Sequence, residues 1–172
     1  MKSVLISIQP KWCELIASGK KTVEVRKTKP KLEPPFKCYI YCTIGDGAKG
    51  DILPQSRVTC GKVIGEFVCY DIAKILNFVT HFGVEGRPER ELNTIARASF
   101  LDYMDMLEYF GTDKDGYAWH ISDLKIYDHP KELSEFCSYD ARIYIGENGF
   151  PMPTHAITRP PQSWCYVKGG AE

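Results

Sequence analysis

Three charged side chains, Lys21, Glu24 and Arg26, fall within six residues of one another, directly after Gly19. The local pattern predicts that a helix ends at Gly19 and that a strand follows at once. A lysine that loses hydration has a lowered pKa and can act as base or nucleophile, while Glu24 and Arg26 could orient a polar substrate. The same charges on an edge strand could serve only to discourage aggregation. The segment therefore predicts the location of a site without naming its reaction.

The two-residue spacing of a strand places Glu24 and Arg26 on one face and Val23 and Val25 on the other. Lys21 falls on the valine face unless the strand begins after it. We expect Lys21, Glu24 and Arg26 to line one cleft, with Glu24 and Arg26 side by side. If Glu24 pairs with Arg26, Lys21 is left for chemistry, whereas pairing with Lys21 would give a binding site with a fixed cation.

The elements around this segment are predicted from periodicity and breakers. Alternation over 3–9 indicates a strand, and Pro10 opens a short helix with an apolar stripe at Trp12, Leu15 and Ile16. Ser99–Asp102 resembles a capping box before a helix that ends at Gly111. Further strands are predicted over 20–28, 36–44, 61–72, 117–127 and 163–167, and a short helix over 130–136. We predict an α+β fold, a small and mostly antiparallel β-barrel with flanking helices, in a single domain 1–172 with a helical insertion at 76–116.

Composition excludes several classes of protein. The net charge is zero over 172 residues, which argues against a generic polyanion binder. The charge is segregated, because residues 1–37 hold nine Lys/Arg and three Asp/Glu, whereas residues 71–137 hold seven and thirteen. No apolar run reaches the roughly 18 residues of a membrane helix, and the start does not resemble a signal peptide. We therefore expect a cytoplasmic protein without a membrane partner.

The cysteines and glycines do not predict a cofactor. Seven cysteines without a C-x-x-C pair or a secretion signal argue against structural zinc and against a disulfide framework. Residues 45–50 match G-x-G-x-x-G, but Pro54 follows and no helical stripe opens there, so a flexible loop is favoured over dinucleotide binding. We expect no metal and no cofactor.

Aromatic and basic residues supply further candidates for ligand contact. Trp119 shares a predicted strand face with Asp123 and Lys125, which makes it the best candidate for an exposed stacking ring, although core packing remains open. Trp12 is expected to be partly buried. Lys27 begins a basic run that is either a solvated loop or a phosphate contact. His120 is interpreted as a hydrogen-bonded structural histidine rather than a catalytic base.

The segment Gly19-x-Lys21-x-x-Glu24-x-Arg26, preceded by a strand, a proline and a short helix, resembles the signature of the ASCH domain, a branch of the PUA-like superfamily. Gly61–Phe67 is similar to a later barrel strand of that family. The resemblance implies a β-barrel with a cleft beside the motif and an RNA-related role. It also implies hydrolase activity as an alternative, because some ASCH proteins deacetylate N4-acetylcytidine and ribonuclease activity has been attributed to others.

The amidohydrolase type resembles Lys-Thr-x-Thr at this site, followed by a distant Glu. Lys21 carries over, but Glu24 replaces the second Thr, and the later Glu is not placed within 76–116. We therefore expect binding of RNA or a nucleotide-like ligand. The alternative is a hydrolase with Lys21 as base or nucleophile and Glu24 as a second catalytic residue, and a third class is a protein-interaction module with an acidic insertion. The predicted binding residues are Trp12, Lys21, Glu24, Arg26, Lys27 and Trp119.

Overall fold

The computed structural model describes residues 1–44, 59–78, 81–111, 114–139 and 156–169. Its elements alternate between short helices and strands of very unequal length. They are β1 (Lys2–Ile8), α1 (Pro10–Ala17), β2 (Val23–Arg26), β3 (Phe36–Cys42), β4 (Val63–Phe78), β5 (His81–Val84), α2 (Arg90–Ser99), α3 (Tyr103–Phe110), β6 (Gly116–Lys131), the 3-10 helix η1 (Leu133–Glu135) and β7 (Trp164–Lys168).

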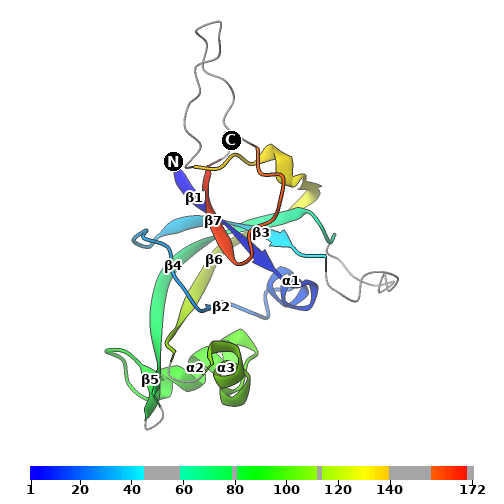
Figure 1. Cartoon of the computed structure of the whole chain (residues 1–172). Helices are drawn as coiled ribbons and strands as arrows, with labels where there is room; N and C mark the ends of the chain where they lie inside the picture. The colour runs from blue at the N-terminus through cyan, green and yellow to red at the C-terminus, as the bar shows by residue number, and fades with distance from the viewer. Residues whose placement is uncertain (45–58, 79–80, 112–113, 140–155, 170–172) are drawn as a thin grey trace, which may run out of the picture. The chain divides into compact units, whose positions relative to one another are not determined.

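Within the described residues, seven strands form one sheet in the order β2-β6-β4-β3-β1-β7, and β5 pairs with β4 (Figure 1). The predicted α+β class is confirmed by this sheet and its accompanying helices. The described pairings run from β2 at one end to β7 at the other without joining these ends, so closure into a barrel stays a prediction.

The chain divides into two compact units. The first unit comprises Met1–Ala17, Lys37–Phe67 and Lys125–Glu172, and the second comprises Ser18–Phe36 and Val68–Leu124. Strands β4 and β6 contribute residues to both units. The predicted organisation as one domain with an insertion at 76–116 stays a prediction, although the helices expected in that insertion are present as α2 and α3.

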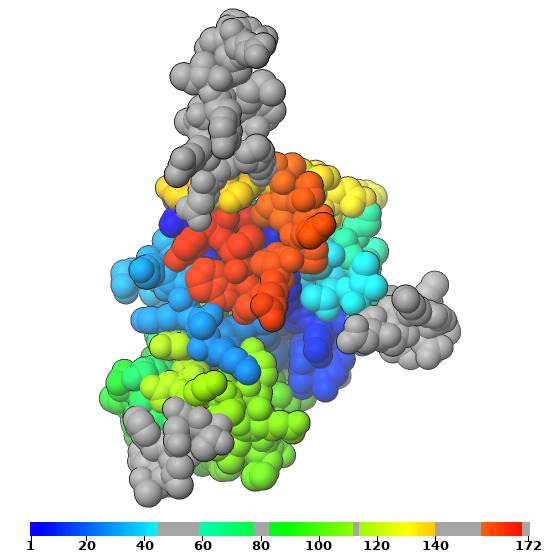
Figure 2. All heavy atoms as spheres, in the orientation of Figure 1, coloured from blue at the N-terminus to red at the C-terminus, as the bar shows by residue number. Residues whose placement is uncertain are grey.

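The core of the first unit is built on β1. This strand pairs in parallel with β3 and antiparallel with β7, and its residues from Ser3 to Ile8 are buried. Strands buried on both faces are typically continuous apolar runs, as Val4-Leu5-Ile6 is here. Helix α1 buries Cys13 and Ile16. In the space-filling view, the residues of β7 lie at the visible surface in red (Figure 2), in agreement with their mostly intermediate exposure.

The second unit has a core of its own, formed by residues of β2, β4, β5, β6, α2 and α3. Its buried members include Val23, Val25, Ile75, Ile95 and Phe110. Strand β2 pairs antiparallel with the first residues of β6. The Phe110 ring packs so closely on Gly116 that a Cβ there would lie 2.0 Å from Cζ, so only glycine fits.

The expected start of the second helix of the insertion was misplaced. Ser99 ends α2, and Phe100 follows it in the left-handed conformation with φ 57°. The capping box is formed by Asp102 and Asp105 at the start of α3 instead. The residue type at Ser99 suits a helix start, but the left-handed turn at Phe100 ends one helix before the next can begin. The short helix predicted over 130–136 is likewise reduced to η1, because β6 continues to Lys131.

Candidate functional site

Strand β2 is shorter than predicted and begins at Val23, so Lys21 lies before the strand. The alternation of side chains along β2 therefore does not extend to Lys21, and it does not place Lys21 on the face of Val23 and Val25. The segment is fixed by backbone hydrogen bonds: the Thr22 N–H donates to the carbonyl of Ala98 at 3.1 Å, and the Thr22 carbonyl accepts from the Ile121 N–H at 2.9 Å. These bonds tie the residues of the candidate site to the end of α2 and to β6.

The structure brings Lys21, Glu24 and Arg26 together inside the second unit. Glu24 Oε1 lies 3.1 Å from Arg26 Nη2, and Glu24 Oε2 lies 3.5 Å from Lys21 Nζ. Lys21 Nζ also donates a hydrogen bond to the carbonyl of Ser99 at 2.5 Å. Glu24 and Arg26 are thus side by side, as expected, and the carboxylate bridges both cations with the shorter contact to Arg26. We refer to Lys21, Glu24 and Arg26 as the charged cluster.

The charged cluster is buried. The exposed fractions of Lys21, Glu24 and Arg26 are 2%, 5% and 8%. Burial lowers the pKa of Lys21, the Glu24 carboxylate opposes this shift, and the Arg26 guanidinium adds to it. The three side chains comprise two cations and one anion, in an interior where charges interact strongly. The cleft predicted beside them stays a prediction.

The remaining predicted site residues lie in different settings. Lys27 is exposed, and its ammonium sits over the ring of Tyr109 at 5.0 Å from the centroid. Trp12 is half-buried in the first unit, where Lys11 Nζ lies 4.2 Å from its ring centroid. The roles of Lys27 and Trp12 in ligand binding stay predictions.

The exposure expected of Trp119 is wrong, because its side chain is 0% exposed. The ring packs edge-on against Phe36, with centroids 6.0 Å apart and an interplanar angle of 81°. The prediction assumed unbroken alternation, which would place Trp119 on the same exposed strand face as Asp123 and Lys125. Asp123 has a positive φ of 47°, so regular extended geometry is interrupted between the two halves of β6 and the alternation does not continue through it. In this conformation the Trp119 ring is not available to stack on a base.

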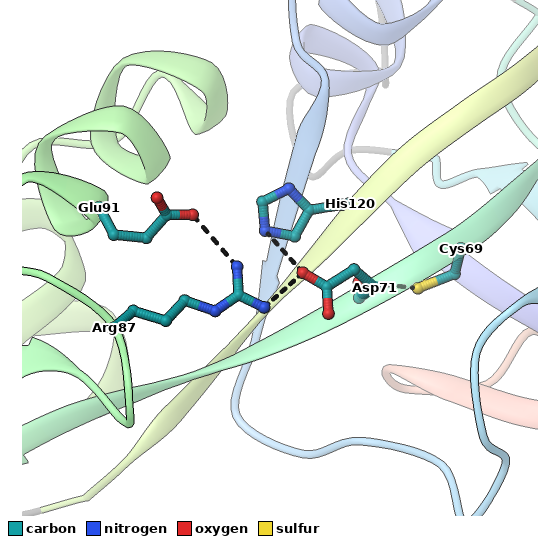
Figure 3. Close-up of polar contacts among 5 residues, drawn as sticks. All are labelled: Cys69, Asp71, Arg87, Glu91 and His120. Atoms are coloured by element: carbon teal, nitrogen blue, oxygen red, sulfur yellow. Dashed lines mark hydrogen bonds and ion pairs between the residues drawn. The ribbon is translucent and has the colours of Figure 1, made fainter.

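A second polar cluster in this unit was missed by sequence reasoning. Asp71 accepts a hydrogen bond from Arg87 at 2.5 Å, and Arg87 also pairs with Glu91 at 3.1 Å (Figure 3). His120 Nε2 lies 3.9 Å from the same Asp71 oxygen, and Cys69 contacts the backbone of Asp71. The Arg87–Glu91 pair has the helical i,i+4 spacing and was therefore detectable. No local sequence pattern indicates that this pair lies beside Asp71 and His120.

His120 is buried, as expected of a structural histidine, with an exposed fraction of 9%. The expected hydrogen bond is not found at Nε2, which has no hydrogen-bond partner within the described residues. Burial lowers the pKa of His120, the Asp71 carboxylate opposes this shift, and Arg87 adds to it. The ring also lies 5.6 Å from that of Tyr70. The lowered pKa favours the neutral form of this side chain.

The described elements define an α+β protein in which a helix–strand junction presents a buried charged cluster. Residues 6–83 match the family model described as the ASCH domain. Over these residues the sequence is therefore similar to the ASCH domain family, and the resemblance inferred from Lys21, Glu24 and Arg26 is confirmed.

Solved structures support the same relation at the level of the fold. The crystal structure of ASCH from Zymomonas mobilis is similar with a TM-score of 0.58 and 22% sequence identity, over 96% of this chain and 87% of that chain. Two variants of the same Zymomonas mobilis protein give the same TM-score and identity, over 96% and 98% of this chain and 88% and 91% of theirs. Comparison with curated protein sequences gives no match. At this identity the structures inform the fold alone.

Two further expectations bear on cofactors and membranes. Among the described residues, no three His, Cys, Asp or Glu side chains are placed to hold a metal ion. The G-x-G-x-x-G match at 45–50 lies outside the described residues. In the described part of the chain, no helix has the length and apolarity needed to span a bilayer.

We predict that Glu24→Gln destabilises the protein by about 3–5 kcal/mol, because it leaves two buried cations without their shared carboxylate. Lys21→Met is the matched control. It removes one of the two cations and replaces the side chain by an apolar one of similar length, so its effect on the free energy of unfolding should be smaller. Urea denaturation of both variants measures the difference. Equal losses would show that the shared carboxylate is not what stabilises the cluster.

We predict that the protein loses stability as the pH falls below about 6.5, the ordinary pKa of histidine. Because the folded-state pKa of His120 is lowered, the unfolded chain binds the proton more readily, so the free energy of unfolding falls until the folded-state pKa is reached. His120→Gln should reduce this pH dependence. Thermal unfolding from neutral to mildly acidic pH checks it, and an identical pH profile for the variant would contradict the assignment.

Proposed function

We propose that the chain binds RNA or a nucleotide-like ligand beside β2. The observation that carries this proposal is the charged cluster, in which a single carboxylate is shared by two buried cations. Lysine and arginine are the side chains that bind phosphate, and phosphate is the anion that every nucleotide carries. The ASCH domain match over 6–83 supports the same ligand class, since the resemblance to that family implies an RNA-related role.

The segment that contains the cluster is basic beyond the cluster itself. Residues 18–36 hold six Lys/Arg and two Asp/Glu, a net charge of +4. Lys20, Lys27, Lys29 and Lys31 are exposed. Such lysines can contact phosphates without reading sequence. Because the whole chain has no net charge, binding by this segment would be local rather than a general attraction to polyanions.

Aromatic rings lie under two of these exposed lysines. Lys27 Nζ is 5.0 Å from the ring centroid of Tyr109, and Lys29 Nζ is 6.0 Å from that of Tyr117. Each contact keeps an ammonium near the surface of the second unit at a modest gain in energy. The lysines are therefore partly positioned before any ligand arrives. Trp12 stays a proposed contact, whereas the buried ring of Trp119 supports the site only by packing.

We predict that a labelled single-stranded RNA binds with an affinity that falls steeply with salt. Replacing Lys27 and Lys29 together by Gln should weaken binding and reduce the slope of log affinity against log salt by about 0.7 for each phosphate that the variant no longer neutralises. Fluorescence anisotropy at several salt concentrations measures both quantities. Lys114→Gln is the matched control, since Lys114 is an exposed lysine of the same unit outside the basic segment.

Two results of this experiment would contradict the proposed RNA binding. If the Lys27→Gln, Lys29→Gln variant binds RNA like the parent at every salt concentration, the basic segment is not the binding surface. If the parent shows no saturable RNA binding, the binding function itself is wrong.

The second candidate function is hydrolysis of a modified nucleoside or of RNA in the same place. One observation favours it: burial lowers the pKa of Lys21, which increases the fraction of the neutral, nucleophilic amine. The shorter contact of Glu24 is to Arg26, so the carboxylate is only partly engaged with Lys21. In this role Lys21 would be the base or nucleophile, and Glu24 would position it and set its pKa.

We predict that, if the protein deacetylates N4-acetylcytidine, Lys21→Met abolishes the reaction while the protein stays folded. Chromatography measures the cytidine that is released, and circular dichroism checks the fold. Lys114→Met removes an exposed lysine of the same unit outside the basic segment and should leave the activity unchanged. Full activity in Lys21→Met, with an active parent, would exclude a catalytic lysine at this position.

The wider setting that we propose follows from the same resemblance. The chain would act as one PUA-like barrel domain in the cytoplasm, with RNA or a nucleotide-like molecule as its partner and without a bound cofactor. A protein partner for the acidic insertion is not proposed.

A further inference from the structure

Two cysteines of the first unit lie side by side at the junction of β3 and β4. Cys42 is the last residue of β3, and its Sγ lies 3.8 Å from Sγ of Cys60. The backbone holds them there, because the Gly61 N–H donates to the Cys42 carbonyl at 2.8 Å and the Cys42 N–H donates to the Lys62 carbonyl at 2.9 Å. The proximity is thus a consequence of strand pairing rather than of one side-chain rotamer.

The two thiols differ in accessibility. Cys42 is 0% exposed, whereas Cys60 is exposed. A disulfide bond is about 2.0 Å long, so the sulfurs must approach by about 1.8 Å, which a change of side-chain rotamer at the exposed cysteine can supply. One thiol of the pair can therefore meet a reagent from solvent, while the other is buried beside it.

We propose that Cys42 and Cys60 form a reversible disulfide by exchange with a small-molecule disulfide such as oxidised glutathione. This site is unrelated to the charged cluster and does not depend on the proposed function. It also differs from a structural disulfide framework, since all seven cysteines are free thiols in the folded chain.

The exchange takes two steps. The Cys60 thiolate attacks one sulfur of oxidised glutathione, forms a mixed disulfide and releases one glutathione thiolate. The Cys42 thiolate then attacks the Cys60 sulfur, the mixed disulfide breaks, and the second glutathione leaves as a thiolate. The two cysteines lose two protons and two electrons, and the oxidant is reduced to two molecules of glutathione. Reduced glutathione reverses both steps.

Accessibility assigns the first attack to Cys60, and the electrostatics of the pair affect the relative rates of the two steps. Hydrogen bonding with Cys13 and Cys60 lowers the pKa of the Cys42 thiol, although burial acts against it. Burial and the neighbouring Cys42 raise the pKa of Cys60 to about 11. The first attack by Cys60 is therefore slow, and the second attack by Cys42 is fast. The mixed disulfide should not accumulate while Cys42 is present.

Cys13 is the competing partner for Cys42. It is fully buried, and its thiol donates to the carbonyl of Ile8 with an Sγ–O distance of 3.4 Å. Because neither Cys13 nor Cys42 is exposed, a small-molecule disulfide cannot begin the exchange at either of them. The first sulfur to react must be that of Cys60.

The test uses the purified full chain, reduced and then equilibrated with mixtures of oxidised and reduced glutathione at neutral pH. Acid quenching, alkylation of free thiols and peptide mass spectrometry then locate each modified cysteine. Fragment ions are needed to separate Cys38 from Cys42, because trypsin leaves both in one peptide. The expected result is a Cys42–Cys60 disulfide that disappears when reduced glutathione is added in excess.

Three variants make the result decisive. Cys42→Ser should accumulate glutathione on Cys60, Cys60→Ser should leave Cys42 as a free thiol, and the control Cys137→Ser should behave like the parent. The proposal is overturned if the parent accumulates glutathione on Cys60, if Cys42 pairs with Cys13, or if the parent stays fully reduced in oxidised glutathione.

Discussion

The carboxylate of Glu24 is the group on which the candidate site depends. Each of its oxygens faces a different buried cation, Arg26 at 3.1 Å and Lys21 at 3.5 Å. Without it, two like charges would share a space where desolvation already costs several kcal/mol per ion. The same carboxylate holds both cations close together, and the proposed binding of an anion depends on these cations. One residue therefore matters both for folding and for the proposed function.

Much of the fold follows from local signals. The positions of β1, α1 and β3 were predictable because Pro10, Gly19 and the Pro-rich segment 29–35 mark their ends. The length of β4 and β6 was not, because each strand continues past the point where its apolar alternation fades. The error at Trp119 has a related cause. The face of a residue depends on unbroken alternation, and a single positive φ at Asp123 interrupts it.

The candidate site was predictable only where it is local. Glu24 and Arg26 are two residues apart on one strand, so their contact follows from strand geometry. The carbonyl of Ser99, which accepts from Lys21, and the meeting of Asp71 with Arg87 and His120 are set by tertiary packing across long stretches of chain. No spacing rule could have found these pairs. The contact between Cys42 and Cys60 is predictable in part, because strand pairing explains it once β3 and β4 are known to be neighbours.

The bond between Lys21 and Ser99 links the charged cluster to a helix end. Ser99 is the last residue of α2, and carbonyls at a helix C-terminus lack intrahelical partners and carry partial negative charge. The ammonium of Lys21 thus acts as a C-terminal cap for α2. A phosphate that drew this ammonium away would uncap the helix, and the backbone amides at the end of α2 would exchange their hydrogens with solvent faster. Binding of a ligand at the charged cluster would then be measurable as faster hydrogen exchange at the end of α2.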